Sequence, residues 1–186
     1  MTLLTRTGIL SASDRCAAGE RKDESGLLLK TLAESLPSEV VAYQVVSDDP
    51  EPLQKVLLQM VDLFKCDLIL TTGGTGLSPR DNTPEATQAV IEREIPGIAE
   101  AVRSAGLAKT KFAALSRGLA GLRGKTLIIN LPGSPEAVLN SFEVLAPLLT
   151  HALDLVHGRI HDCKKIREAE RKEPPCHTSR FSHSHS

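Results

Sequence analysis

Two hydrophobic runs constrain the fold of this chain more than any other feature. Residues 67–72 (Asp-Leu-Ile-Leu-Thr-Thr) and 126–131 (Thr-Leu-Ile-Ile-Asn-Leu) are apolar through their centres and do not alternate apolar with polar. A strand with one buried face alternates, whereas a strand covered by helices on both faces does not. The two runs therefore predict central strands of a parallel sheet that lies between two helical layers.

The segments around these runs favour the same architecture. Further strands are predicted at residues 7–12 and 40–46, and apolar residues at helical spacing predict helices at 24–36, 51–64, 84–94 and 135–157. Thr83 is the expected N-cap of the third helix, Pro96 ends it, and Pro147 is expected to bend the fourth. Residues 106–124 give no clear pattern. We predict a three-layer α/β/α sandwich with a mostly parallel, Rossmann-like sheet.

Length and composition set the domain count and exclude some classes of protein. The chain has 186 residues, 41% of them hydrophobic, which suits one core, so we predict a single domain at 1–158. Residues 159–186 are first dense in charge and then rich in Pro, Ser and His, which predicts a flexible tail. A net charge of −1 gives no general attraction to nucleic acid. With no membrane-length apolar stretch, no signal peptide and no CxxC pair among the cysteines, we expect a cytoplasmic protein without a membrane partner.

A glycine-rich loop follows the strand at 67–72 directly. Residues 73–76 read Gly-Gly-Thr-Gly, and Arg80, Asp81 and a Thr-Pro helix start at 83–84 come next. Glycine lets backbone N–H groups approach an anion closely, and a helix N-terminus adds favourable partial charge. The loop predicts a phosphate site, although a tight turn without a ligand has about equal weight on this motif alone. The P-loop and dinucleotide-binding fingerprints are absent.

All four predicted strands end in polar or glycine-rich groups. These groups are residues 11–15, 47–49, 73–81 and 130–134. Ligands of parallel sheets bind outside the carboxyl ends of the strands, so the four groups are expected to form one site.

Carboxylates in that site point to a divalent cation. Asp14, Asp48 or Asp49, and Asp81 would face the phosphates, and two unit charges about 4 Å apart interact by about 4 kcal/mol at an effective dielectric of roughly 20. Mg²⁺ relieves this repulsion because it binds one or two carboxylates together with phosphate oxygens. Arg80 and Arg117 are candidates to stabilise the same oxygens. The pattern predicts magnesium-dependent transfer from a nucleoside triphosphate.

Each of these residues also has a structural interpretation. Asp14 could cap the helix that follows it, and Asp81 could bond only to the N-terminus of the helix at Pro84. Asp48 and Asp49 could be N-terminal charges on the helix at 51–64, an interpretation that we favour for Asp49. A Pro-Gly turn would explain Asn130 and Gly133, and a solvated loop would explain Ser116 and Arg117. Cys16 and Cys66 are expected to be inert.

A series of motifs resembles the molybdopterin adenylyltransferase family, which includes bacterial MogA and the G domain of gephyrin. The resemblance covers about residues 5–157, and Asn82 departs from the valine of the family without displacing Asp81. The motifs are Thr-Thr-Gly-Gly-Thr-Gly at 71–76, Pro-Arg-Asp at 79–81, Thr-Pro-Glu-Ala-Thr at 83–87, Ile-Glu-Arg-Glu at 91–94, Pro-Gly at 96–97, Leu-Ser-Arg at 115–117 and Asn-Leu-Pro-Gly-Ser at 130–134.

The resemblance implies a reaction and a set of site residues. The phosphate of molybdopterin attacks the α-phosphorus of Mg-ATP, which yields adenylyl-molybdopterin and pyrophosphate before molybdenum insertion. The resemblance further implies a homotrimer and a MoeA-like molybdenum insertase as partner. Asp48 and Asp81 are expected to be catalytic and to bind Mg²⁺; the expected substrate and nucleotide contacts are Ser13, Asp14, Gly73, Gly74, Thr75, Gly76, Arg80, Ser116, Arg117, Asn130, Pro132, Gly133 and Ser134.

Two other functions remain open at this stage. A MoaB-like protein would bind molybdopterin with little transfer, although the complete set of carboxylates argues against it. A module like the gephyrin G domain would serve as a scaffold, although no second domain is visible in the sequence.

Overall fold

A computed structural model describes residues 4–159, so the predicted tail lies almost wholly outside the described residues. No helix within residues 4–159 is both long and apolar enough to cross a membrane. In chain order the elements are β1 (Thr5–Ala12), α1 (Asp14–Ala17), α2 (Glu24–Glu34), β2 (Ser38–Val46), α3 (Pro50–Asp62), β3 (Leu68–Thr72), α4 (Thr83–Val90), β4 (Arg93–Glu94), α5 (Pro96–Leu107), the 3₁₀ helix η1 (Lys111–Leu115), β5 (Ala120–Arg123), β6 (Thr126–Leu131) and α6 (Pro135–Val156).

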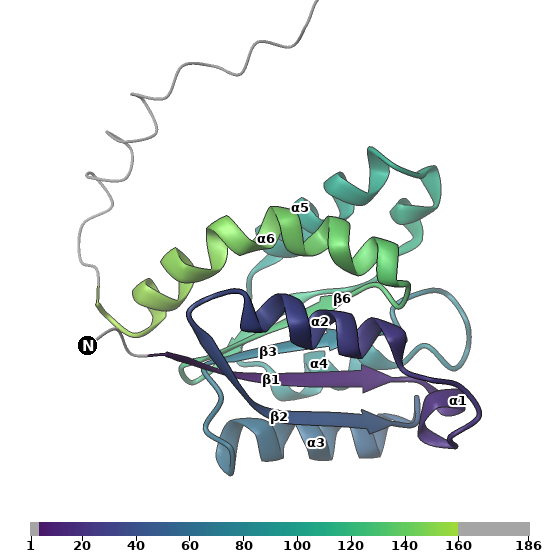
Figure 1. Cartoon of the computed structure of the whole chain (residues 1–186), viewed down its shortest axis with the longest axis horizontal. Coiled ribbons are helices and arrows are strands. Elements are labelled where there is room, and N and C mark those ends of the chain that lie inside the picture. The colour runs from purple at the N-terminus through teal and green to yellow at the C-terminus, as the bar shows by residue number, and fades with distance from the viewer. Residues whose placement is uncertain (1–3, 160–186) are drawn as a thin grey trace, which may run out of the picture.

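The strands form a six-stranded sheet between two layers of helices (Figure 1). The strand order is β2-β1-β3-β6-β5-β4, with the first four strands parallel and β5 and β4 antiparallel to their neighbours. Helices α2, α5 and α6 cover one face, and α3 and α4 cover the other. The predicted four strands and the mostly parallel α/β/α sandwich are confirmed.

Strand β3 shows why the sequence lacks alternation. Leu68 and Leu70 pack in the cluster under α2, α5 and α6, whereas Ile69 packs in the cluster over α3. All three side chains are almost completely buried. Both faces of the strand are therefore core, as the apolar run predicts.

The helices begin where the sequence favours a helix start. Four of them carry proline in the first turn, where its missing N–H costs no hydrogen bond. Helix α6 continues through Pro147 as one element. The N-cap of α4 is Asn82, so the prediction of Thr83 is wrong by one residue, and Thr83 is the first residue of the helix.

The prediction of a helix over 84–94 is wrong at its C-terminal end. Helix α4 stops at Val90, and Arg93 and Glu94 form the short edge strand β4, which pairs with Leu122 and Gly121 of β5. The Glu92 amide also donates to the Leu122 carbonyl at 2.8 Å. Hydrogen bonds to a distant strand thus override the local helical pattern. The end of α5, together with η1 and β5, occupies the segment that gave no clear pattern.

Candidate functional site

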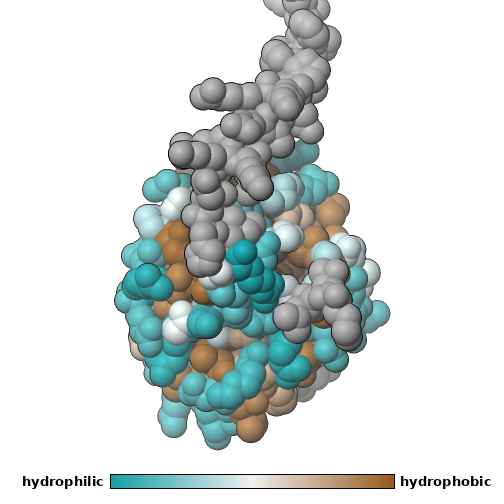
Figure 2. Space-filling model, turned by 90° about the vertical axis from the view of Figure 1, so that its left-hand side faces the viewer, coloured by the Kyte–Doolittle hydropathy of each residue, from teal (hydrophilic) through white to brown (hydrophobic). Residues whose placement is uncertain are grey.

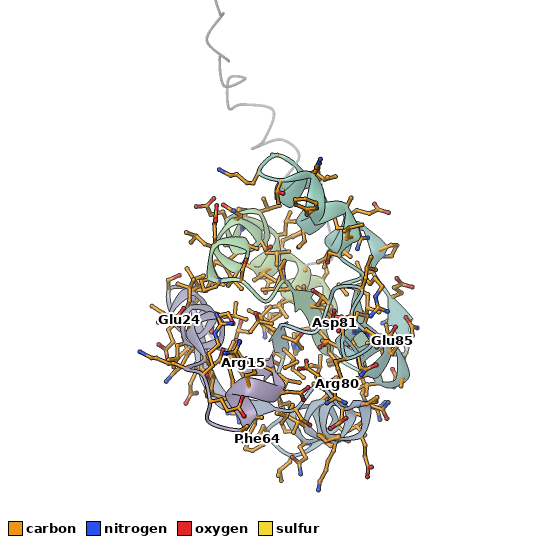
Figure 3. All side chains as sticks on the ribbon, turned by 90° about the vertical axis from the view of Figure 1, so that its right-hand side faces the viewer. Arg15, Glu24, Phe64, Arg80, Asp81 and Glu85 are labelled. Atoms are coloured by element: carbon orange, nitrogen blue, oxygen red, sulfur yellow. The ribbon has the colours of Figure 1, made fainter. Side chains whose placement is uncertain are left out.

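The loops that follow β1, β2, β3 and β6 meet at the carboxyl edge of the sheet, which faces the viewer in Figure 3. Arg80, Asp81 and Glu85 lie on one side of this edge, and Arg15 of α1 lies across from them (Figure 3). Hydrogen bonds link the segments directly: the Asp14 amide donates to Asp48 Oδ2 at 2.9 Å, and the Asp48 amide donates to Asp14 Oδ1 at 3.0 Å. The structure therefore brings the predicted groups together.

The glycine loop adopts a backbone that suits an anion. Gly73 and Gly74 have φ of +91° and +60°, a region that other residues rarely enter. The Gly73 amide donates to the Leu131 carbonyl at 3.3 Å, whereas the amides of Gly74, Thr75 and Gly76 have no acceptor among residues 4–159. Successive free amides in such a turn are suited to phosphate oxygens.

Arg80 neutralises two of the nearby carboxylates. Its Nε and Nη2 donate to the two oxygens of Asp14 at 3.0 and 2.8 Å, and its Nη1 donates to Asp49 Oδ1 at 2.6 Å. These hydrogen bonds lower the pKa of the Asp14 and Asp49 carboxyls. Asp14 does not cap α1, because the Ser13 hydroxyl does so. Asp49 occupies the N-cap position of α3, which places its charge at the N-terminus of that helix, without a side-chain cap hydrogen bond.

Asp48 and Asp81 lie against the glycine loop. A Cβ atom built on Gly74 would lie 3.0 Å from Asp48 Oδ1, and one built on Gly76 would lie 3.0 Å from Asp81 Oδ2. Burial raises the pKa of Asp48, and the negative charges of Asp14 and Asp81 raise it further. Asp81 Oδ2 accepts from the Ser78 amide at 2.8 Å and so stabilises its own loop, not the start of α4.

This pair of carboxylates fits a magnesium ion that is shared with a phosphate. No group of three or more His, Cys, Asp or Glu side chains in residues 4–159 is arranged as a complete metal site. Mg²⁺ usually takes only one or two protein carboxylates and completes its shell with water and substrate phosphates. Two carboxylates of like charge beside free amides meet that requirement, and a cation would relieve the repulsion that acts on Asp48.

Two hollows flank the glycine loop. The larger one, of about 480 Å³, has a size typical of small-molecule sites, and its lining includes Thr75, Gly76, Ser116, Pro132 and Ser134. The smaller one, of about 190 Å³, is lined by residues that include Ser13, Arg21, Lys22, Gly73 and Gly133. A more open depression of about 670 Å³ over α3 contains none of the predicted site residues.

Two more of the predicted contact residues, besides Asp14 and Arg80, are engaged within the protein. The Asn130 side chain is buried, donates to the hydroxyls of Thr71 and Thr87 at 3.0 and 2.9 Å, and accepts from the Leu119 amide. Arg117 is bound to the loop that contains Asp81 and does not belong to a solvated loop. The sequence predicts that both residues lie near the site, but it does not reveal these contacts.

Several residues of the site have no signal in the sequence. Arg103, Lys109 and Phe112 line the larger hollow from α5 and the segment that follows it. The Thr83 hydroxyl is buried and has no hydrogen-bond partner in the described part of the chain. A Cβ atom on Gly74 would lie 2.4 Å from this hydroxyl, which places it beside the loop. The lack of pattern in residues 106–124 conceals Lys109 and Phe112, no motif marks Arg103, and the sequence around Thr83 indicates only a helix start.

Comparison with known proteins identifies the family. The model of the family described as "Probable molybdopterin binding domain" matches residues 8–151. The chain belongs to this family. The molybdopterin adenylyltransferase of Helicobacter pylori (strain ATCC 700392 / 26695) is 43% identical over 154 residues, which cover 81% of this chain and 87% of that protein. The enzyme of the same name from Escherichia coli K12 is 38% identical over 141 residues, which cover 74% and 72%.

Solved structures in the family share the fold. The molybdopterin biosynthesis enzyme MoaB of Thermus thermophilus superposes with a TM-score of 0.79 at 52% identity and covers 83% of this chain and 98% of its own. The molybdopterin biosynthesis Mog protein of Mycobacterium ulcerans gives a TM-score of 0.78 at 43% identity, with 82% and 99% covered. The predicted resemblance to the family is confirmed.

Proposed function

We propose that this protein catalyses the transfer of the adenylyl group of ATP to molybdopterin, with release of pyrophosphate, during molybdenum cofactor biosynthesis. The observation that carries the proposal is the placement of Asp48 and Asp81 against a glycine loop in which three amides have no acceptor among residues 4–159. Relatives that are named molybdopterin adenylyltransferase, at 38 to 43% identity, support the choice of reaction.

The glycine loop, the two aspartates and Arg80 have separate roles in binding a highly charged substrate. The amides of Gly74, Thr75 and Gly76 donate to phosphate oxygens, and Asp48 and Asp81 hold Mg²⁺. When bound, the ion neutralises the negative charge that develops on the departing pyrophosphate. Arg80 lowers the local negative charge further, because its guanidinium neutralises Asp14 and Asp49.

The reaction needs no activated side chain. An oxygen of the molybdopterin phosphate, already ionised at neutral pH, forms a bond to the α-phosphorus of ATP. The bond between that phosphorus and its bridging oxygen breaks, and the electron pair leaves with pyrophosphate. Catalysis then rests on positioning and on charge neutralisation, as in other phosphoryl transfers.

The hollows beside the loop are assigned to the rest of the substrates. Ser116, Pro132 and Ser134 contact a bound ring system in the larger hollow, and Ser13, Gly73 and Gly133 border the smaller one. Asn130 contributes indirectly, because its hydrogen bonds to Thr71 and Thr87 hold the end of β6, from which Pro132 and Ser134 continue. Of the predicted binding residues, Asp14, Arg80, Asn130 and Arg117 are engaged with other protein groups and are not assigned a direct substrate contact.

Three further properties are part of the proposal. A homotrimer and a MoeA-like insertase partner follow from the resemblance to the family, and light scattering of the purified protein tests the first. A cytoplasmic location agrees with the free thiols of Cys16 and Cys66.

The decisive experiment is an assay of pyrophosphate release. The purified protein is mixed with molybdopterin and Mg-ATP, and release is expected only when both substrates are present. EDTA is expected to abolish it. Absence of release while molybdopterin remains intact and bound would refute the transferase.

A second candidate function is binding of molybdopterin without efficient transfer. The observation that favours it is the 52% identity to a Thermus thermophilus protein named MoaB. The same assay separates the two functions, because a carrier binds molybdopterin but releases no pyrophosphate.

A further inference from the structure

The loop that carries Asp81 is held by an arginine from a distant segment. Arg117 Nε donates to the Gly76 carbonyl at 2.7 Å, and its Nη2 donates to the Asp81 carbonyl at 2.5 Å. Its Nη1 pairs with the Glu85 carboxylate of α4, and its own amide donates to the Thr75 carbonyl at 2.9 Å. One residue thus holds both ends of the loop between the last glycine and Asp81.

Asn82 makes an equivalent link toward Asp48. Its Nδ2 donates to the Asp48 carbonyl at 3.0 Å and to the Arg80 carbonyl at 3.2 Å. An amide nitrogen has two N–H groups, and both are used here. The segment after β2, which contains Asp48, is therefore fastened to the residue that follows Asp81.

We propose that Arg117 and Asn82 are positioning residues that together set the spacing of the Asp48 and Asp81 carboxylates. The importance of that spacing rests on the proposed function. The two side chains hold the backbone on either side of Asp81 and the backbone of Asp48, and neither contacts substrate. We call the pair the carbonyl brace, because, apart from one ion pair, these side chains donate to backbone carbonyl oxygens.

A comparison with Arg80 explains why Arg117 stays in place. Arg80 is bound to the side chains of Asp14 and Asp49, and about half of its own side chain is exposed. Arg117 is less exposed, at 35%, and two of its nitrogens donate to backbone carbonyls. The guanidinium is a rigid, planar fork, so it cannot turn one nitrogen toward a phosphate without losing the other contacts.

Steady-state kinetics distinguish positioning from substrate contact. We expect Arg117→Lys and Asn82→Val to lower kcat by about 10- to 100-fold, because small misplacements of catalytic groups cost that much, with KM changed by less than about threefold. In a background of Asp81→Asn the same substitutions are expected to have little further effect on kcat, since the group that they position is already disabled. Glu85→Gln is the matched control, because it weakens the ion pair of Arg117 and leaves both carbonyl contacts available.

A rise in KM with an unchanged kcat would overturn the inference and make Arg117 a substrate contact. Additive losses in the Asp81→Asn background would overturn it as well, since the brace would then act independently of Asp81.

Hydrogen exchange tests the brace without reference to activity. The hydrogen-bonded amides of residues 78, 80, 81 and 83 are expected to exchange at least about threefold faster in Arg117→Lys and Asn82→Val than in the native protein or Glu85→Gln. Unchanged exchange would overturn the brace. If the native protein releases no pyrophosphate, the proposed function fails, and the exchange experiment still decides whether these two side chains hold the loop.

Discussion

Both edges of the sheet carry charged side chains and a hollow, but the two edges differ in how far their polar groups are paired within the protein. The amino edge, which faces the viewer in Figure 2, mixes hydrophilic and hydrophobic side chains. Residues that include Cys66, Asp67 and Glu92 line a hollow of about 370 Å³ there. Two acidic side chains of this edge, Asp67 and Glu92, are matched by nearby protein groups. Asp67 accepts from the Arg6 amide at 2.9 Å and lies 3.0 Å from His157 Nε2, and Glu92 accepts from the Gly124 amide at 3.0 Å.

At the carboxyl edge, several polar groups have no partner among the described residues. Three loop amides lack an acceptor among the described residues, and the Thr83 hydroxyl lacks a partner there. The pKa of Asp48 is raised by burial and by its acidic neighbours. The edges differ in that successive backbone amides without an acceptor in residues 4–159 gather beside the carboxylates of the carboxyl edge, and this gathering, more than charge or a hollow alone, supports the proposed site.

The strongest test of this comparison removes a carboxylate from the carboxyl edge. We expect Asp81→Ala and Asp48→Ala to reduce adenylyl transfer by at least about 10³-fold, because the charge that holds the magnesium ion is lost. The circular dichroism spectrum should stay native. Full activity of either purified variant would remove that residue from the proposed mechanism.

A change to the backbone of the carboxyl edge should affect both stability and activity. A Cβ atom on Gly73 would lie 2.3 Å from the Ala12 carbonyl oxygen at φ +91°, so Gly73→Ala is expected to cost about 2–3 kcal/mol in the free energy of unfolding. Urea denaturation measures this loss. Gly97→Ala is the matched control, because a Cβ atom there meets nothing within 4 Å.

A change at the amino edge should affect stability alone. Asp67→Ala removes the acceptor of the Arg6 amide and the partner of His157, which should cost about 1–3 kcal/mol. Transfer measured at a temperature well below the Tm should remain within about twofold of native. A large loss of activity in this folded variant would contradict the division between the edges.

The smallest effect concerns the thiol at the amino edge. Burial raises the pKa of Cys66 to about 11, so its reactive thiolate is scarce at pH 8. Alkylation of Cys66 by iodoacetamide should be at least about 100-fold slower in the native protein than in urea. Mass spectrometry of the peptide that contains Cys66 measures both rates, and rapid labelling of native protein would show that this edge is not inert.

Local patterns were sufficient for the central part of the molecule. The apolar runs of β3 and β6 identified strands buried on both faces, and parallel strands place their carboxyl ends together. That rule alone brought Asp14, Asp48 and the glycine loop to one edge.

Long-range hydrogen bonds were beyond the reach of those patterns. Strand β4 exists because Arg93 pairs with Leu122, a partner far along the chain that no local period encodes. Arg117 and Asn82 were harder still, because their acceptors are backbone carbonyls, which are the same in every residue. A sequence motif records which side chains are present, and it does not record which carbonyl each of them holds.

The carbonyl brace has a consequence for engineering of this protein. Arg117 and Asn82 hold carbonyl oxygens of the loop. The Ser78 hydroxyl accepts from the Arg80 amide at 3.3 Å, so these contacts that shape the loop do not involve the side chain of Leu77. Leu77, with 63% of its surface exposed, is therefore a position where new side chains could be introduced beside the site while the carboxylates keep their places. An exposed side chain that can be replaced without moving the backbone beside the site is a suitable starting point for directed evolution of substrate preference.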